Sequence, residues 1–194
     1  MVKKLNIYLF RHGQTTFNRD KRFTGWLDPS LTNLGKKHAK TLTIKLKNKN
    51  FQVAFYTRLS RSKQTLNVVL KYHPECKTLI LDNRMIERSY GRLEGKTHKY
   101  VIKKYGKKKF ELWHRDYNIR PPKGESFAMV EKRVKSFISF LTKYMRKNKV
   151  SVSISAHSNS IRLFRKIMEK SSPKEATSWF IPYNRVFVYT IKVK

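Results

Sequence analysis

Apolar residues along the chain fall into short runs separated by longer amphipathic stretches. Short apolar runs are typical of buried strands, and they occur here at residues 5–10, 51–56, 77–81, 150–155 and 185–193. The last run is rich in β-branched and aromatic residues, which further favours a strand. We therefore expect a sheet whose strands come from widely separated parts of the chain.

The stretches between these runs have the spacing of helices. In residues 126–145, Val130, Val134, Phe137 and Leu141 trace one apolar stripe. The other expected helices span residues 33–47, 59–72, 97–105, 107–115 and 161–168. Alternating strands and helices predict an α/β fold, a three-layer sandwich in which helices flank a mainly parallel sheet. No internal repeat or linker divides the sequence, so we expect a single domain over residues 1–194.

Two of the expected strands end in segments that carry a histidine. The first strand leads into Arg11, His12 and Gly13, and the fourth leads into His157 and Ser158. Parallel strands of one sheet place their carboxyl ends at the same edge, where open α/β sheets bind ligands. We therefore expect both histidines to face one pocket.

Composition excludes several classes of protein. With 39% hydrophobic residues in 194, the chain can bury a core, and wholesale disorder is excluded. No apolar stretch is long enough for a membrane span or a signal peptide. The single cysteine, Cys76, cannot form an internal disulfide. We expect a cytoplasmic protein.

The formal net charge of +33 indicates an anionic partner. Net charge alone does not choose between nucleic acid, a membrane surface and a phosphorylated small molecule. Lysines are scattered along the whole chain, which favours a solvated surface over a compact nucleic-acid patch. Residues 96–109 combine lysines with Tyr100 and Tyr105, which suits nucleic acid and equally suits a helix face beside an anion pocket. We expect a phosphorylated small-molecule substrate, without specific nucleic-acid or membrane binding.

The residue types at the predicted pocket suit phosphoryl transfer. Neutral imidazole is a good nucleophile near pH 7, and guanidinium groups neutralise the charge of a transferring phosphoryl group. Arg11 directly precedes His12, and Arg61 lies at the start of the helix that follows the second strand. The sequence contains no carboxylate cluster of the kind that binds Mg²⁺. Arginines and the second histidine would then stabilise the transferring group.

Glu87 is the candidate proton donor for the leaving oxygen. It stands out because Asp and Glu together number only 12 in this chain. The alternative is an ordinary ion pair with the nearby Arg84 or Arg88.

A series of motifs runs in order from residue 7 to about residue 162. They are LFRHGQTTFN at 9–18, FTGWLD at 23–28, LTNLG at 31–35, TRLSRSKQT at 57–65, ERSYGRLEG at 87–95, WHR at 113–115, GES at 124–126 and HSNSIR at 157–162. An isolated Arg-His-Gly triplet would be a weak signal, whereas the ordered series is specific. It resembles the histidine phosphatase superfamily and, within it, the cofactor-dependent phosphoglycerate mutases.

The resemblance implies a phosphoglycerate mutase-like fold and interconversion of 3-phosphoglycerate and 2-phosphoglycerate, a step of glycolysis and gluconeogenesis. It implies a phosphohistidine at His12, primed by 2,3-bisphosphoglycerate and independent of metal. The implied catalytic residues are His12, Glu87, His157, Arg11 and Arg61. The expected substrate-binding residues are Arg11, Asn18, Thr24, Gly25, Arg61, Glu87, Arg88, Tyr90, His98, His114, Arg115, Ser158 and Asn159.

The chain departs from the family pattern at several positions. His98 stands where the mutases typically have a lysine, His114 stands in place of the first arginine of a pair, and Ser158 replaces a glycine. For His98 and His114, substrate contact and plain solvent exposure are both open. The segment between Pro122 and Gly124 is short, and the chain stops soon after its last strand. Those regions help to cover the active site in the family, and their loss would admit water.

Two alternatives follow. A wetter site would make the protein a histidine phosphatase that hydrolyses phosphomonoesters. From another class, the chain could be a basic nucleic-acid-binding protein on an inherited enzyme scaffold, and its binding would then survive physiological salt in a mobility-shift assay. The sequence also leaves homo-oligomer formation open.

Overall fold

The structure is a computed structural model that describes residues 3–193. Within those residues one five-stranded sheet forms, in the order β3-β2-β4-β1-β5. The strands are β1 (Lys3–Arg11), β2 (Val53–Tyr56), β3 (Thr78–Leu81), β4 (Val152–Ala156) and β5 (Val186–Val193). All pairings are parallel except that of β5 with β1, which is antiparallel. The five expected strands and the mainly parallel sheet are thus confirmed.

Helices fill the connections between the strands. They are α1 (Thr16–Arg19), α2 (Asn33–Leu46), α3 (Ser60–Leu70), α4 (His98–Tyr105), α5 (Lys107–Arg115), α6 (Phe127–Asn148), α7 (Ser158–Glu169) and α8 (Pro173–Ser178), with short 3₁₀ turns η1 (Asn83–Met85) and η2 (Gly91–Leu93). Every expected helix is present. Helices α1 and α8 were not predicted, because they are too short to show a hydrophobic period. The start of α8 nevertheless carries a recognisable signal, a capping box between Ser172 and Glu175 with a proline in the first turn.

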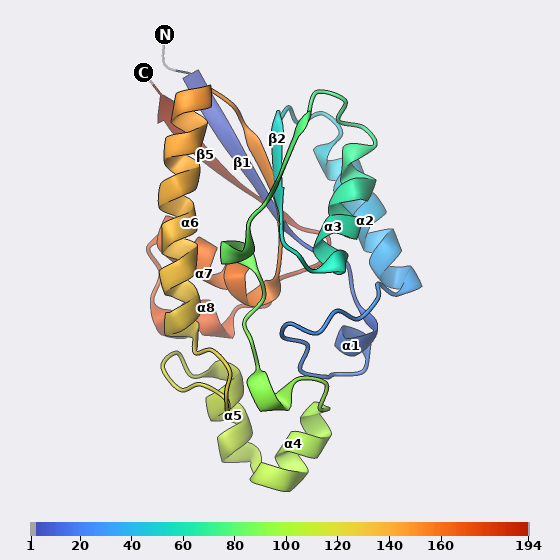
Figure 1. Ribbon diagram of the computed structural model, residues 1–194, viewed down its shortest axis with the longest axis vertical. Helices are drawn as coiled ribbons and strands as arrows, with labels where there is room; N and C mark the ends of the chain where they lie inside the picture. The colour runs from blue at the N-terminus through green and yellow to red at the C-terminus, as the bar shows by residue number, and fades with distance from the viewer. Residues whose placement is uncertain (1–2, 194) are drawn as a thin grey trace.

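The sheet lies between two helical layers, with α6, α7 and α8 on one face and α2 and α3 on the other (Figure 1). Strand β1 shows how the sequence builds both. Leu5, Ile7 and Leu9 belong to the core on the α6 and α7 side, whereas Tyr8 and Phe10 belong to the core beneath α2 and α3. Alternate residues of a strand point to opposite faces, so one apolar run supplies both cores.

Helices α4 and α5 form a separate unit at the end of the molecule opposite the two termini (Figure 1). They surround a third apolar cluster that contains Phe23, Tyr90, Leu93, Val101 and Phe110. Because β1 starts near the termini and ends toward this unit, the carboxyl ends of the parallel strands face it. A site at that edge is therefore enclosed by the sheet on one side and by the α4 and α5 unit on the other.

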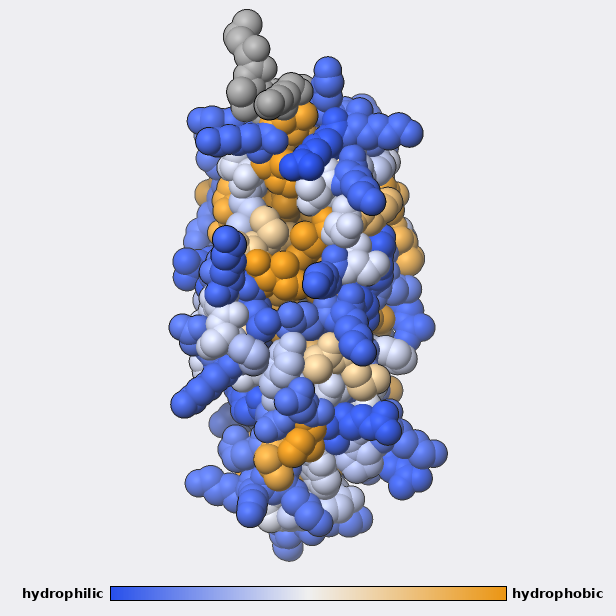
Figure 2. Space-filling view, turned by 90° about the vertical axis from the view of Figure 1, so that its left-hand side faces the viewer, coloured by the Kyte–Doolittle hydropathy of each residue, from blue (hydrophilic) through white to orange (hydrophobic). Residues whose placement is uncertain are grey.

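Hydrophilic side chains cover much of the face shown in Figure 2, from one end of the molecule to the other. The distribution agrees with the scattered lysines of the sequence. Among the helices of residues 3–193, none is both long and apolar enough to cross a membrane.

Candidate active site

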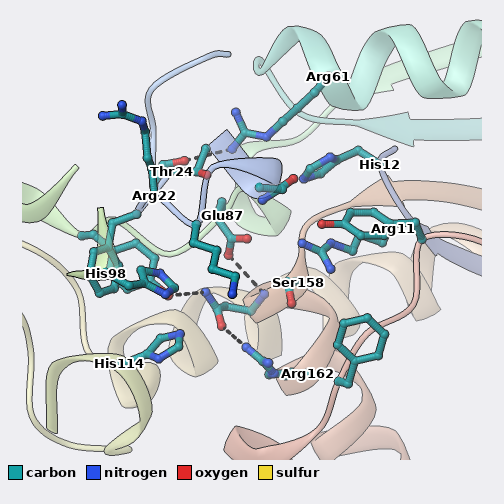
Figure 3. Close-up of a pocket in the computed structure, with 18 of the residues that line it drawn as sticks. Arg11, His12, Arg22, Thr24, Arg61, Glu87, His98, His114, Ser158 and Arg162 are labelled. Carbon is teal, nitrogen blue, oxygen red and sulfur yellow. Dashed lines mark hydrogen bonds between the residues drawn. The ribbon is translucent and has the colours of Figure 1, made fainter. Parts of the chain in front are cut away.

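A cavity of about 260 Å³ lies at the carboxyl ends of the strands, facing the α4 and α5 unit. Its lining residues are Arg11, His12, Asn18, Lys21, Arg22, Phe23, Thr24, Gly25, Arg61, Glu87, Tyr90, His98, His114, Arg115, Ser158, Asn159, Arg162, Phe180 and Tyr183. In Figure 3, His12, Arg11 and Arg61 lie on one side and His98 and His114 on the opposite side, with Glu87 between them. We call Arg11, His12, Arg61 and His157 the proximal end, and Lys21, His98, His114 and Arg115 the distal end.

His12 directly follows β1, and its backbone N–H donates to the carbonyl of Ala156 at 3.1 Å. The imidazole Nδ1 lies 2.7 Å from the carbonyl oxygen of Gly13. A carbonyl only accepts, so Nδ1 carries the proton and Nε2 keeps its lone pair. Burial, and then the charges of Arg61 and Arg11, lower the pKa of His12 well below its usual value. His12 is therefore a neutral imidazole whose Nε2 is free for nucleophilic attack.

The turn after His12 depends on a close approach of two backbone segments. A Cβ atom on Gly13 would lie 2.2 Å from the carbonyl oxygen of Gly35, which the backbone cannot accommodate without shifting. The Gly13 N–H also donates to the Thr65 hydroxyl at 3.0 Å. The glycine of the Arg-His-Gly triplet thus anchors the nucleophile against α2 and α3.

His157 caps α7 and lies behind the cavity lining. Its ring centroid is 5.0 Å from that of His12. Its Nε2 lies 2.8 Å from the Thr57 hydroxyl, and the side chain is fully buried. Burial, followed by the charge of Arg61, lowers its pKa well below the usual value. The two strand ends thus bring both histidines together, but only His12 lines the cavity, so the expectation that both face one pocket holds for His12 and not for His157.

Arg61 lies in the first turn of α3 and is 1% exposed. Its guanidinium donates to the carbonyls of Gly25 at 2.9 Å and Leu27 at 2.7 Å. Arg11 donates to the carbonyl of Ile181 at 2.9 Å. These backbone contacts hold both guanidinium groups beside the nucleophile before any ligand arrives.

Several buried polar atoms near His12 have no hydrogen-bond partner within residues 3–193. They are the Nε atoms of Arg11 and Arg61, the Thr24 hydroxyl and the Nδ1 of His157. Buried polar groups are normally paired, because leaving one unpaired costs about 1–3 kcal/mol. An oxyanion bound beside His12 would provide the missing acceptor for the two guanidinium groups and the hydroxyl.

Glu87 is 7% exposed and lies between the two ends of the cavity (Figure 3). Its Oε1 accepts from the backbone N–H groups of Arg88 at 2.8 Å and Asn159 at 3.1 Å. Within residues 3–193 it forms no ion pair, and Arg84 pairs instead with Asp82. The ion-pair alternative for Glu87 is therefore wrong. Two backbone donors hold one carboxylate oxygen, which leaves Oε2 for the ligand.

The distal end combines cations with uncharged imidazoles. His98 and His114 pack on each other with centroids 5.1 Å apart, and both contact the ring of Phe23. Burial, followed by the charge of Arg115, lowers the pKa of both, that of His114 to about 2. Lys21 lies close enough to His98 to lower its pKa as well. Both histidines are neutral at physiological pH, so Lys21 and Arg115 carry the positive charge here.

Most of the expected site residues line the cavity together, and two do not. His157 lies behind the lining, as described above. The fully buried Arg88 stacks on Tyr90 and Phe127 and donates to the carbonyl of Trp113 at 2.8 Å. Arg88 thus holds the end of α5, and its substrate contact stays a prediction.

The sequence analysis missed several residues that line the cavity. Arg22 directly precedes the FTGW motif, and Arg162 ends the HSNSIR motif, so both had a visible signal. Burial lowers the pKa of Arg162 to about 9. Lys21, Phe180 and Tyr183 had no such signal in the sequence, because they lie in irregular segments. Within residues 3–193, no group of three or more His, Cys, Asp or Glu side chains is arranged to hold a metal ion.

Comparison with known proteins gives consistent matches along the chain. The model of the histidine phosphatase superfamily (branch 1) matches residues 7–193. A 2,3-bisphosphoglycerate-dependent phosphoglycerate mutase from Parvibaculum lavamentivorans is 33% identical over 193 residues, covering 97% of this chain and 91% of its own.

Solved structures show the same fold. Phosphoglycerate mutase from Bacillus anthracis superposes with a TM-score of 0.82 at 23% identity, over 97% of this chain and 88% of its own. A putative alpha-ribazole-5'-P phosphatase from Escherichia coli superposes with a TM-score of 0.76 at 21% identity, over 89% and 83%. The fold is thus common to mutases and phosphatases, and the lining of the cavity must distinguish them.

Proposed function

Because the chain belongs to the histidine phosphatase superfamily, branch 1, we propose that it is a 2,3-bisphosphoglycerate-dependent phosphoglycerate mutase that interconverts 3-phosphoglycerate and 2-phosphoglycerate. One observation carries the proposal: a single small cavity has cationic side chains at both of its ends. The nucleophile lies at only one of them.

The charge distribution suits a substrate with an anionic group at each end. Arg11 and Arg61 are placed for the phosphoryl group that is transferred to His12. Lys21 and Arg115 are placed for a second anionic group across the cavity. A phosphoglycerate carries both a phosphate and a carboxylate, and guanidinium groups bind both geometries well. The phosphate ester of a neutral alcohol has no second anionic group, so a hydrolase for such esters would bind nothing at the distal cations.

The name of the Parvibaculum relative supports the same reading, since that protein is called a 2,3-bisphosphoglycerate-dependent phosphoglycerate mutase. Residues of this chain fit such a bisphosphate. The unpaired buried donors of Arg11, Arg61 and Thr24 would hold one phosphate, and Lys21 and Arg115 would hold the other. When bound, 2,3-bisphosphoglycerate supplies the phosphoryl group that primes His12.

The mechanism follows from the free lone pair on His12 Nε2 and from the position of Glu87, whose Oε2 is left for the ligand. The lone pair on His12 Nε2 attacks phosphorus, the bond from phosphorus to the substrate oxygen breaks, and Glu87, acting as the general acid through Oε2, gives a proton to that oxygen. In the return step the substrate hydroxyl attacks phosphorus, the P–N bond breaks, and Glu87 takes the hydroxyl proton. Transfer from His12 to one hydroxyl and recapture from the other exchanges the position of the phosphate.

The other proximal residues stabilise charge on the moving phosphoryl group. Arg11 and Arg61 face its oxygens with guanidinium groups already held by backbone carbonyls, so little reorganisation is needed. The N-terminus of α7 adds a favourable dipole, because Ser158 and Asn159 open that helix at the cavity. Metal is not required for this scheme, in which arginines carry the stabilising charge.

The test is to incubate the protein with 3-phosphoglycerate and a trace of 2,3-bisphosphoglycerate in the presence of chelator, following 2-phosphoglycerate and free phosphate together. Rapid isomer formation with little phosphate release is the expected result. Phosphate release without isomer formation would overturn the mutase assignment in favour of the phosphatase alternative.

A further inference from the structure

Residues 177–183 comprise the last two residues of α8 and most of the connection to β5, and Phe180 and Tyr183 of this segment line the cavity. We call residues 177–183 the arginine-held segment. Arginines of the cavity donate to alternate carbonyls of this segment: Arg115 to Thr177 at 2.9 Å, Arg162 to Trp179 at 2.8 Å and Arg11 to Ile181 at 2.9 Å. The three arginines come from β1, α5 and α7. The arginine side chains that give the cavity its positive charge therefore also hold this segment in place.

Further contacts hold the side chains of the segment. Ile181 is fully buried in the main core. The ring of Tyr183 lies 4.0 Å from the Arg11 guanidinium carbon and stacks on His38, with centroids 4.9 Å apart and planes within 1°. The guanidinium carbon of Arg165 lies 4.0 Å from the Trp179 ring. The segment is consequently held on both sides of Phe180.

Phe180 differs from these neighbours, because it lines the cavity yet is 71% exposed. Burying a phenylalanine side chain stabilises a folded protein, so holding one in water at a cationic cavity forgoes that stabilisation. The side chain lies at the mouth of the cavity and has no hydrogen-bonding group. It can cover a bound ligand without offering a partner to water.

The segment between Pro122 and Gly124, whose shortness predicted a less covered site, indeed does not cover the cavity. None of residues 116–126 lines the cavity. Instead the short turn packs against η2, where the N–H of Arg92 donates to the carbonyl of Pro122 at 2.9 Å. A Cβ atom on Gly91 would lie 2.3 Å from that carbonyl oxygen, so the two backbones are in close contact. Among the residues that line the cavity, Lys21, Arg22 and Phe180 are exposed, and Phe180 alone of these three is apolar.

We propose that Phe180 selects the acceptor of the phosphoryl group, favouring the substrate hydroxyl over water by covering the mouth of the occupied cavity. The inference rests on the proposed function, since it requires a phosphohistidine at His12. In both reactions the P–N bond breaks, its electron pair returns to Nε2, a P–O bond forms and Glu87 takes the acceptor proton. Because both acceptors use the same base, only access to phosphorus separates isomerisation from release of inorganic phosphate.

The test uses isolated phosphoenzyme, formed with radiolabelled 2,3-bisphosphoglycerate and freed of ligand, then mixed with saturating 3-phosphoglycerate. The measured quantity is the ratio of label in inorganic phosphate to label in bisphosphoglycerate and 2-phosphoglycerate. Phe180→Ala is expected to raise this ratio about tenfold by opening the mouth to water. Phe180→Trp keeps a large apolar side chain at this position, and the ratio is expected to stay as low as in the wild-type protein. Tyr72→Ala, the matched control, removes a 56% exposed aromatic ring away from the cavity and is expected to change nothing.

Each outcome decides the inference. An unchanged ratio in Phe180→Ala, with phosphoenzyme formed normally, would overturn the role of Phe180 and leave the proposed function standing. Failure of the wild-type protein to form phosphohistidine would overturn both. The high exposure of Phe180 means that its removal leaves the core intact, and an unchanged urea midpoint for Phe180→Ala verifies this.

Discussion

The proximal and distal ends of the cavity hold their side chains by different means. At the proximal end, backbone carbonyls hold guanidinium groups, and buried donors lack a partner within residues 3–193. At the distal end the Thr177 carbonyl likewise holds Arg115, but His98 and His114 lie among aromatic rings around Phe23, with the cations of Lys21 and Arg115 beside them. The first arrangement resembles a preorganised reaction centre, and the second resembles an adaptable recognition surface.

Under the proposed function, this difference assigns the chemistry to the proximal end and substrate selection to the distal end. The proximal residues belong to motifs within the stretch that matches the superfamily, and under the proposed function they would serve phosphoryl transfer to a histidine whatever the alcohol. Two of the departures from the mutase pattern, His98 and His114, lie at the distal end, whereas the third, Ser158, directly follows the proximal His157. Changes at the proximal end should therefore alter the rate of transfer, whereas changes at the distal end should alter binding.

The largest expected effect comes from His12→Ala, which removes the nucleophile. We expect no phosphoenzyme and no isomerisation, measured by acid-quenched labelling and by formation of 2-phosphoglycerate. The matched distal variant His98→Ala should still become labelled. Labelling of His12→Ala, or its loss in His98→Ala, would break the proposed division between the two ends.

Glu87→Gln should have the next largest effect. The amide keeps the shape of the side chain but cannot transfer the proton, and losing a general acid or base typically costs about 10²–10⁴ in rate. We expect single-turnover labelling of His12 to slow by that factor, with the circular dichroism spectrum unchanged. Near-normal labelling would remove Glu87 from the mechanism.

Lys21→Gln is expected to act on binding. Loss of one distal cation should raise the KM for 3-phosphoglycerate by about tenfold and leave kcat within about twofold, because the missing contact is made equally in ground and transition states. Lys99→Gln removes an exposed lysine that does not line the cavity and serves as the control. A fall in kcat with unchanged KM would place Lys21 in the chemical step instead.

A further expected effect concerns stability and leaves catalysis aside. Burial lowers the pKa of His12 and His157 in the folded state, so below pH 6.5 the unfolded chain takes up protons that the folded chain does not. The free energy of unfolding should thus be highest above pH 6.5 and fall by about 1.4 kcal/mol per pH unit for each histidine as the pH drops toward 5. Urea unfolding at pH 8, 7, 6 and 5 measures this. His12→Asn should reduce the slope, and a flat profile between pH 7 and 5 would contradict it.

Local features of the sequence were sufficient for much of the fold and site. The apolar runs predicted every strand, and the stripe through Val130, Val134 and Phe137 predicted the long helix α6. The resemblance to the histidine phosphatase superfamily is confirmed by the match over residues 7–193. These features were readable because strand and helix periods, and motifs around His12, are properties of neighbouring residues.

Other features depend on contacts between distant segments. Nothing in the apolar run at 185–193 indicates that β5 pairs antiparallel with β1 at the sheet edge. The order of the strands in the sheet depends on which apolar faces of distant segments pack against each other. The backbone donors that bind Glu87, from Arg88 and Asn159, come from separate parts of the chain for the same reason.

The sequence by itself determined the alternation of elements, the two histidines at strand ends and the family. Only the tertiary structure decided that Arg88 is buried behind Tyr90, that His98 and His114 are desolvated and uncharged, and that Phe180 is held exposed at the cavity mouth. The physical reason is that burial and charge state depend on every group packed around a side chain. Those groups come from parts of the chain that no local pattern connects.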